Sequence, residues 1–233
     1  MSPLYLYAVL AGAPAGPLGA GMLDEPLRLI DCDGVFAAAG ELSSAPPLGP
    51  ETLRGHDAVV RRLAAASEAL LPARFGTITP DEAQLRDQLA RGVEGLREAL
   101  GRVAGREQMI LRIFSTTSRG PGSELAPPQA AAPADAGGPG TRYLVERART
   151  QQAAADLHEL TPLRPVLDRF VVAERIERHE RRPLIASVYH LVARGTGGSY
   201  RAAVDDAART LSGIRVTVSG PWAAYAFAPE ALG

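Results

Sequence analysis

The stretch from Thr116 to Thr141 holds five prolines, five glycines and an alanine-rich tract. Such a composition carries too little large apolar surface to offset the entropy of ordering the chain. It therefore predicts a linker or long loop between two folded segments. The chain of 233 residues also exceeds the usual single-domain size of roughly 100 to 200 residues. We expect an N-terminal domain of residues 1–115, a linker of residues 116–141 and a C-terminal domain of residues 142–233.

Short apolar runs predict the first strands. Leu4 to Leu10 reads LYLYAVL and has the apolar and aromatic density of a buried strand. Leu27 to Asp31 and Val35 to Ala39 flank the turn-forming pair Asp33 and Gly34. The second and third runs therefore predict a hairpin.

A first helix is predicted from Pro50 to Leu70. Pro50 suits the first helical turn, and Pro72 would end the helix. Apolar positions recur at spacings of three, four and seven, which is typical of a helix with one face on a core. The residues expected on that face are Leu53, His56, Val60, Leu63 and Leu70. Arg74 to Ile78 would form a short strand after it.

A second, longer helix is predicted from a capping box. Thr79 would be the N-cap, Pro80 would occupy the first helical position, and Glu82 would return a hydrogen bond to the cap. An apolar stripe continues from Leu85 to Val103, and Gly105 would close the helix.

The element order sets the fold class. Gln108 to Phe114 (QMILRIF) reads as a buried strand and completes the first half. Strands that alternate irregularly with two helices suit an antiparallel or mixed β-sheet covered by helices. We therefore expect an α+β fold in the N-terminal domain.

The second half predicts a modified ferredoxin-like domain. The expected elements are a helix from Arg142 to about Leu160, strands from Arg169 to Ile176 and from Leu184 to Ala193, a helix from Tyr200 to Leu211, and a strand from Ile214 to Val218. This order is that of a ferredoxin-like unit whose first strand is absent or supplied elsewhere.

Charge and composition exclude several classes of function. The formal net charge is -1 with both signs interspersed, so no basic field is available to collect nucleic acid. All 25 basic residues are arginine, which excludes any mechanism that needs a lysine amine. A single cysteine, Cys32, fits a reducing cytosol. No uninterrupted apolar run approaches about 18 residues, so we expect no membrane span.

The segment LIDCDGV, Leu29 to Val35, is the strongest catalytic signal. Asp31 and Asp33 follow an apolar strand, as in magnesium-dependent phosphotransfer enzymes. That chemistry also needs a cation on the phosphate and further carboxylates at a strand end, whereas Asp205 and Asp206 lie inside a predicted helix. We therefore favour a turn over a catalytic site. The four histidines are widely spaced, so we expect no metal site.

The closing segment VSGPWAAYAF, Val218 to Phe227, gathers Trp222, Tyr225 and Phe227 beside Pro221. Aromatic side chains at this density commonly seal a core, and here they would seal the C-terminal domain. They could instead form a surface that docks a partner.

With these segments in view, the chain resembles the gas vesicle GvpL/GvpF family. YLYAVL (Tyr5 to Leu10), the helix with His56 that leads into LPARFGT (Leu71 to Thr77), GPGTRYLVER (Gly138 to Arg147) and GPWAAYAF (Gly220 to Phe227) carry the resemblance. One departure is that Ala223 and Ala224 stand where the family commonly has prolines. The motif positions, structural or partner-binding, are Tyr7, His56, Pro72, Arg74, Phe75, Gly76, Thr77, Tyr143, Leu144, Gly220, Pro221, Trp222, Tyr225 and Phe227.

The resemblance implies a cytoplasmic protein that helps to build, line or nucleate gas vesicles and is not an enzyme. Its expected partners are the small hydrophobic shell protein and other gas vesicle accessory proteins, with no cofactor. Two alternatives remain at this point. One is a magnesium-dependent phosphotransfer enzyme that uses Asp31 and Asp33, and the other is a protein-interaction module outside gas vesicles.

Overall fold

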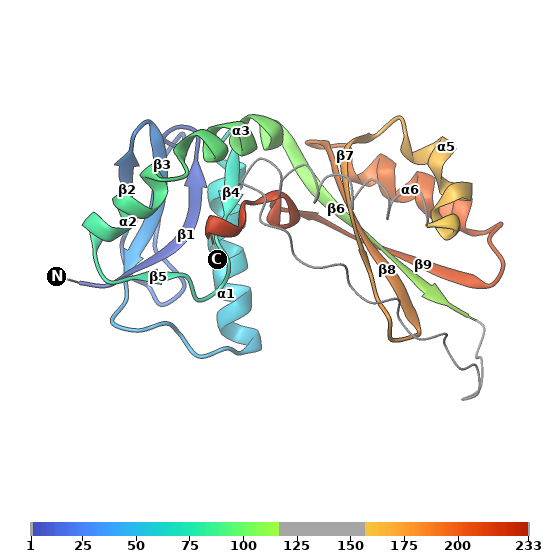
Figure 1. The fold of residues 1–233 in the computed structure, drawn as a ribbon, viewed down its shortest axis with the longest axis horizontal. Helices are drawn as coiled ribbons and strands as arrows, with labels where there is room; N and C mark the ends of the chain where they lie inside the picture. The colour runs from blue at the N-terminus through green and yellow to red at the C-terminus, as the bar shows by residue number, and fades with distance from the viewer. Residues whose placement is uncertain (1, 117–156, 233) are drawn as a thin grey trace, which may run out of the picture. The chain divides into compact units, whose positions relative to one another are not determined.

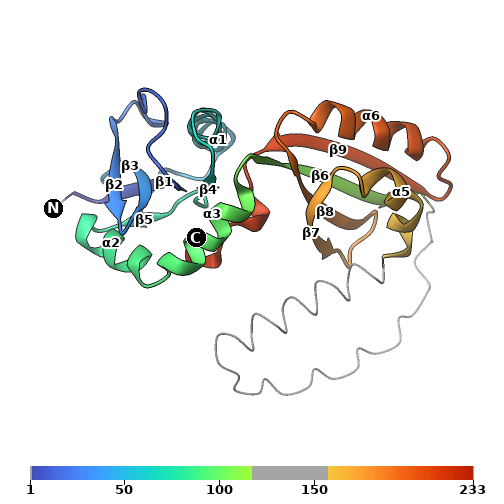
Figure 2. The ribbon, with the colours of Figure 1, turned by 90° about the horizontal axis from the view of Figure 1, so that it is seen from above.

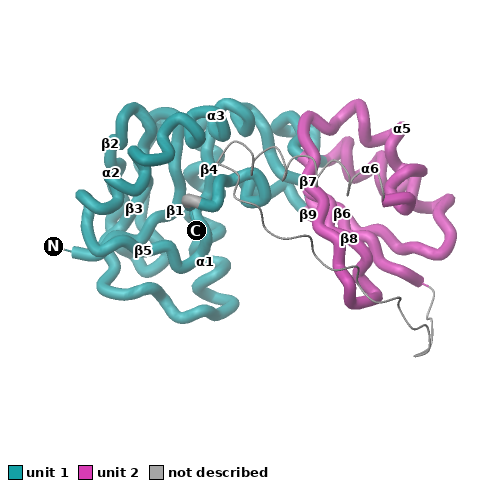
Figure 3. The backbone as a smooth tube through the Cα atoms, viewed as in Figure 1, with its two compact units in different colours: residues 1–109, 191–197, 220–233 teal, residues 110–190, 198–219 magenta. Residues whose placement is uncertain are grey.

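The computed structural model describes residues 2–116 and 157–232 (Figure 1). Its described residues form two compact units, each built from β-strands and helices (Figure 3). The expected α+β class is therefore confirmed. The first unit comprises residues 1–109, 191–197 and 220–233, and the second comprises residues 110–190 and 198–219.

Strand β1 (Leu4–Leu10) lies inside the N-terminal sheet, and all of its residues are buried. Its predicted bounds are confirmed. β1 pairs with β3 (Val35–Glu41) on one side and with β4 (Leu70–Pro72) and β5 (Ile78–Thr79) on the other. β2 (Leu27–Cys32) pairs with β3, which confirms the predicted hairpin. We expected an antiparallel or a mixed sheet, and all of these strand pairs are antiparallel.

Helix α1 (Pro50–Ala65) begins at the predicted proline and packs against the core of this sheet. Its buried residues are His56, Val59, Val60 and Leu63. Two expectations for this helix are wrong, because Leu53 is 42% exposed and Leu70 lies in β4. The chain leaves the helix early because Leu70 gains a strand partner in Leu10 of β1. Pro72 is tolerated at the end of β4 because an edge strand does not need every N–H group.

The strand expected from Arg74 to Ile78 is also wrong. The Thr77 N–H donates to the Arg74 carbonyl at 3.2 Å, so these residues form a turn. Gly76 has a φ of 91°, a value that glycine adopts without the penalty imposed by a Cβ atom. The chain becomes extended only in β5.

The predicted capping box is wrong as well. Helix α2 (Glu82–Ala90) has Asp81 as its N-cap, whose side chain accepts the N–H of Gln84 at 2.8 Å. Thr79 cannot serve as the cap because it pairs with Leu4 in β5. The helix therefore starts later than the sequence pattern indicated.

The single long helix expected up to Gly105 is in fact two helices. α2 ends at Ala90, and α3 (Val93–Val103) starts after Gly92, which is its N-cap. The helix is interrupted at Gly92, whose φ of -119° and ψ of 13° lie outside the helical region. The apolar stripe survives the break, since Leu85, Leu89, Leu96, Leu100 and Val103 are buried.

The second sheet has the order β7-β8-β6-β9. Its strands are β6 (Arg106–Ser115), β7 (Val171–Arg178), β8 (Leu184–Ala193) and β9 (Ile214–Trp222). The helices described in the same part of the chain are η1 (His158–Leu163), α5 (Arg164–Leu167) and α6 (Gly197–Ala208). With β6 and β8 in the centre, this succession is the ferredoxin-like arrangement. β6, which we had placed at the end of the N-terminal domain, supplies the first strand.

Most of the helix expected from Arg142 to Leu160 lies outside the described residues. The same holds for nearly all of the stretch from Thr116 to Thr141. In the part of the chain that the structure describes, no helix is long and apolar enough to cross a membrane.

Candidate functional site

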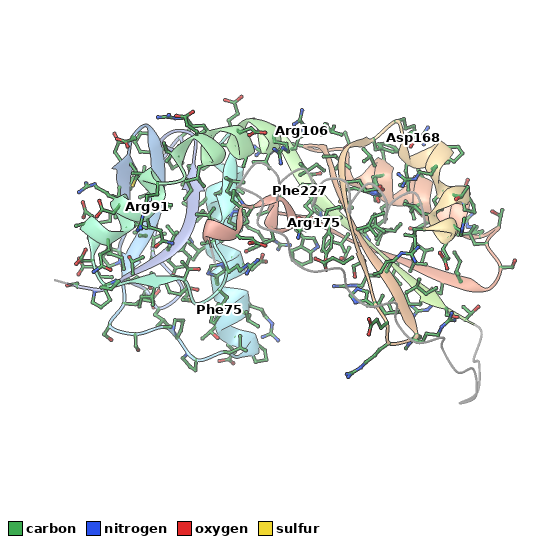
Figure 4. All side chains as sticks on the ribbon, viewed as in Figure 1. Phe75, Arg91, Arg106, Asp168, Arg175 and Phe227 are labelled. Atoms are coloured by element: carbon green, nitrogen blue, oxygen red, sulfur yellow. The ribbon has the colours of Figure 1, made fainter. Side chains whose placement is uncertain are left out.

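Four rings from β1, α1 and the turn after β4 meet inside the N-terminal unit. We call Tyr5, Tyr7, His56 and Phe75 the ring cluster. The rings of Tyr7 and His56 are stacked with centroids 5.5 Å apart, and Tyr5 and Phe75 approach His56 edge-on at 5.7 and 5.8 Å. Figure 4 labels Phe75 beside α1. Except for Phe75, which is partly exposed, these side chains are buried.

Hydrogen bonds join the three segments that carry the rings. The Tyr5 hydroxyl lies 2.9 Å from Nδ1 of His56 and accepts the N–H of Gly76 at 3.0 Å. Nε2 of His56 lies 3.3 Å from the carbonyl oxygen of Ala73. One assignment satisfies every group: His56 is neutral, donates from Nε2 to Ala73 and accepts the Tyr5 hydroxyl at Nδ1.

Burial supports this neutral state. It lowers the pKa of His56 below its ordinary value, although the hydrogen bond to Ala73 acts in the opposite direction. Burial also raises the pKa of Tyr5, so the hydroxyl keeps the proton that it donates. The pair is therefore suited to fixing the turn on the sheet, because all of its polar atoms already have partners.

A second buried pair anchors the loop before β2. The Tyr7 hydroxyl donates to the carboxylate of Glu25 and accepts the N–H of Met22 at 2.9 Å. The same carboxylate accepts the N–H of Leu23 at 2.9 Å. Glu25 is only 8% exposed. Glu25 was not among the residues predicted from the sequence, because no local motif indicates its pairing with Tyr7.

The C-terminal segment is attached to the turn that follows β4. The N–H of Arg74 donates to the Leu232 carbonyl at 3.0 Å, and the Thr77 hydroxyl lies 3.3 Å from the same oxygen. Farther back, the N–H of Ala226 donates to the side-chain oxygen of the buried Gln108 at 2.8 Å. The C-terminal residues of the chain are therefore hydrogen-bonded to the segment LPARFGT.

The closing aromatics belong to the N-terminal unit, which corrects our expectation that they seal the C-terminal domain. Tyr225 packs against the core cluster formed by β1 and α1. The guanidinium carbon of Arg61, on α1, lies 5.0 Å from the centre of the Trp222 ring. Trp222, Tyr225 and Phe227 are each half-buried. They pack here because residues 220–233 return to the N-terminal unit.

The C-terminal unit contains its own partly buried chain of polar side chains, whose members were not predicted from the sequence. Arg164 donates two hydrogen bonds to the Glu174 carboxylate, at 2.9 and 3.0 Å. Nε2 of His190 lies 2.8 Å from the same carboxylate, and Nδ1 lies 2.6 Å from the Tyr200 hydroxyl. Burial raises the pKa of Glu174, but the hydrogen bonds and charges of His190 and Arg164 outweigh burial and lower it overall.

Comparison with known proteins decides the family. The family model described as gas vesicle synthesis protein GvpL/GvpF matches residues 3–229. The chain belongs to the GvpL/GvpF family.

Relatives with known names agree with this assignment. Gas vesicle protein L of Streptomyces sp. (strain CB03234) is 27% identical over 253 residues, which cover 96% of this chain and 92% of that protein. The crystal structure of the gas vesicle protein GvpF from Anabaena sp. PCC7120 has a TM-score of 0.71 at 16% identity and covers 98% of this chain and 97% of its own. GvpF from Microcystis aeruginosa has a TM-score of 0.71 at 14% identity, with coverage of 98% and 100%. These two structures share the GvpL/GvpF fold.

Most GvpL/GvpF motif positions lie in the structural contacts described above. The ring cluster contains Tyr7, His56 and Phe75. The turn after β4 contains Arg74, Gly76 and Thr77, and β4 ends at Pro72. Gly220 precedes Pro221 in β9 and has a φ of 121°, and a Cβ atom there would lie 2.8 Å from the Gln108 carbonyl oxygen. Tyr143 and Leu144 lie outside the described residues. A role for these positions in partner binding stays a prediction.

Asp31 lies in β2, where it pairs with Phe36, and Asp33 lies in the turn between β2 and β3. The carboxylate of Asp31 accepts the N–H of Gly34 at 3.0 Å, and Asp33 has a φ of 54°. Asp205 and Asp206 lie in α6, as expected. Among the described residues, no group of three or more histidine, cysteine, aspartate or glutamate side chains could hold a metal ion. Both aspartates therefore have a structural role in this turn, because Asp31 accepts a hydrogen bond from it and Asp33 adopts its positive φ.

Proposed function

We propose that this chain is an accessory protein of gas vesicle assembly that binds the hydrophobic shell protein. The observation that carries the proposal is the GvpL/GvpF family match over residues 3–229. A hydrophobic subunit that polymerises into a wall exposes apolar segments before it is incorporated, and such segments pair indiscriminately. A folded accessory protein prevents this pairing by covering or positioning the subunit.

Three exposed leucines support the proposal. Leu48 is 80% exposed, Leu23 is 56% exposed and Leu53 is 42% exposed, and we call them the leucine group. Leu48 directly precedes the N-cap of α1, and Leu53 is the fourth residue of that helix. These two positions are the ones that a hydrophobic staple uses. Met22, next to Leu23, lies against Gly55 of the same helix. An apolar group of this kind suits an apolar partner.

The protein acts in the cytoplasm and at the gas vesicle. Its partners there are the shell protein and other gas vesicle accessory proteins, and it lines or nucleates the vesicle. The half-buried Trp222, Tyr225 and Phe227 are additional candidates for partner contact.

Co-purification with the shell protein of the same host tests the proposal. A tagged chain should retain the shell protein, and the triple variant Leu23→Gln/Leu48→Gln/Leu53→Gln should retain about tenfold less, because each lost apolar contact contributes roughly 1 kcal/mol or less. Val172→Gln is the matched control, since Val172 is 54% exposed in the C-terminal unit. Repeated failure of the wild-type chain to retain the shell protein would exclude the proposal.

A further inference from the structure

One face of the C-terminal sheet is turned away from the described helices. Glu174 of β7 and His190 of β8 contact Arg164 of α5 and Tyr200 of α6, so these residues define the face that the helices cover. Figure 1 shows α5 and α6 on the same side of this sheet, and Figure 2 shows them from above. Side chains alternate along a strand, so the neighbours of Glu174 and His190 point to the opposite face.

Contacts between side chains confirm which residues share that opposite face. The Tyr189 hydroxyl of β8 donates to Glu177 of β7 at 2.8 Å. The guanidinium carbon of Arg215 on β9 lies 4.3 Å from the ring centre of Phe114 on β6. The charge of Arg112, on β6, acts on Tyr189. We call this surface the outer sheet face.

The outer sheet face is positively charged although the whole chain is not. Among the residues that the structure describes, it carries the exposed arginines Arg112, Arg175 and Arg215 against one glutamate, Glu177, in a chain with a formal net charge of -1. Figure 4 labels Arg175 on β7. Between the arginines, Phe114 and Tyr189 supply partly exposed aromatic surface.

We propose that the outer sheet face binds an acidic polypeptide segment that also carries apolar side chains. Guanidinium groups pair with carboxylates through two parallel hydrogen bonds, which gives both strength and orientation. Aromatic and arginine side chains are the residues that most often dominate the energy of protein interfaces. Charge complementarity therefore selects an acidic partner, and the aromatic surface selects apolar side chains within it.

Two contacts favour a polypeptide over nucleic acid. Sheet faces that bind single-stranded RNA stack bases on exposed aromatic rings. Here Arg215 already covers a face of Phe114, and Tyr189 is held beside the carboxylate of Glu177. The Glu177 carboxylate on this face repels phosphate, whereas a polypeptide can place its own acidic groups beside the arginines.

Fluorescence anisotropy on the purified full chain tests this inference without any shell protein, so its outcome is independent of the co-purification above. The probe is a labelled peptide of repeated Glu-Leu-Glu-Ser units, and the control peptide has Gln in place of Glu. Arg112→Gln/Arg215→Gln should weaken binding of the acidic peptide about tenfold, as should raising the salt from about 0.05 to about 0.5 M.

Matched variants separate this effect from a general loss of charge or fold. Arg86→Gln/Arg102→Gln removes two exposed arginines from α2 and α3 and should leave the affinity unchanged. Arg112→Lys/Arg215→Lys keeps the charge and should restore part of the binding. Equal affinity of the wild type and Arg112→Gln/Arg215→Gln would overturn the inference. So would equal binding of the Gln peptide, or tighter binding of a labelled oligothymidylate than of the acidic peptide.

Discussion

The Tyr5 hydroxyl and Nδ1 of His56 lie 2.9 Å apart in the core of the N-terminal unit. The hydroxyl also accepts the N–H of Gly76, and Nε2 of His56 lies 3.3 Å from the Ala73 carbonyl oxygen. Through these bonds β1, α1 and the turn after β4 are fixed to one another. The same turn receives the C-terminal residues through Arg74 and Leu232. The motif LPARFGT and the C-terminal residues are therefore joined at the turn that follows β4.

Tyr5→Phe should destabilise the N-terminal unit by about 1 to 3 kcal/mol, because it leaves the buried Nδ1 of His56 and the partly buried N–H of Gly76 without their partner. Thermal unfolding followed by circular dichroism measures the change. Tyr189→Phe is the control, since its hydroxyl bonds Glu177 in an exposed pair. Equal melting temperatures for Tyr5→Phe and the wild type would contradict the hydrogen-bond assignment.

The stability of the protein should decline as the pH falls below about 6.5. Burial lowers the pKa of His56, so the unfolded chain binds a proton in a range where the folded chain does not. The stability that neutral His56 contributes is complete above the pKa that His56 has in the unfolded chain. It is lost as the pH falls toward the lower pKa of His56 in the folded chain. Urea denaturation at a series of pH values should show a smaller decline for His56→Gln. The exposed His158→Gln should keep the wild-type decline, and an identical decline in His56→Gln would argue against a neutral His56.

Leu232→Ala should lower the free energy of unfolding by about 2 to 4 kcal/mol, because Leu232 is only 1% exposed and truncating its side chain leaves a cavity. Urea unfolding followed by the fluorescence of Trp222, which lies in the same unit, measures the loss. Leu48→Ala, at a residue that is 80% exposed, should stay within about 0.5 kcal/mol of the wild type. A similar small effect for Leu232→Ala would show that the C-terminal segment is not bound as described.

Glu174→Gln should destabilise the C-terminal unit by about 1 to 3 kcal/mol near neutral pH, because Arg164 and His190 lose their shared carboxylate. Arg164 is partly exposed, so solvent screening limits the loss. The pKa of Glu174 is lowered, so its contribution is present above about 4.5 and disappears at lower pH. Glu177→Gln, on the exposed face of the same strand, is the control for unfolding measurements. A gap between wild type and Glu174→Gln that persists at about pH 2 would contradict the electrostatic account.

Local patterns predicted the elements whose signals had no competitor. β1 has the predicted bounds because its apolar density allows only a buried strand. The hairpin formed because Asp33 and Gly34 both adopt the positive φ values that its turn requires.

Other elements depended on contacts between distant residues. Thr79 and Asp81 can both cap a helix, and pairing of Thr79 with Leu4 decides in favour of Asp81. The place of β6 in the C-terminal sheet follows from strand pairing that no local pattern encodes. For the same reason the hydrogen bond between Tyr7 and Glu25 could not be predicted. The motif positions around His56 were recognised in the sequence, but their contacts with one another could not be predicted from it.

Deletion of this gene in a gas-vesicle-forming host tests the central claim most directly. Electron microscopy should show few or no vesicles in the deletion strain, and normal vesicles should return with the wild-type gene. A gene that carries Leu23→Gln/Leu48→Gln/Leu53→Gln should restore them less well than one that carries Val172→Gln. Vesicles of normal number and shape in the deletion strain would contradict a role for this chain in gas vesicle assembly.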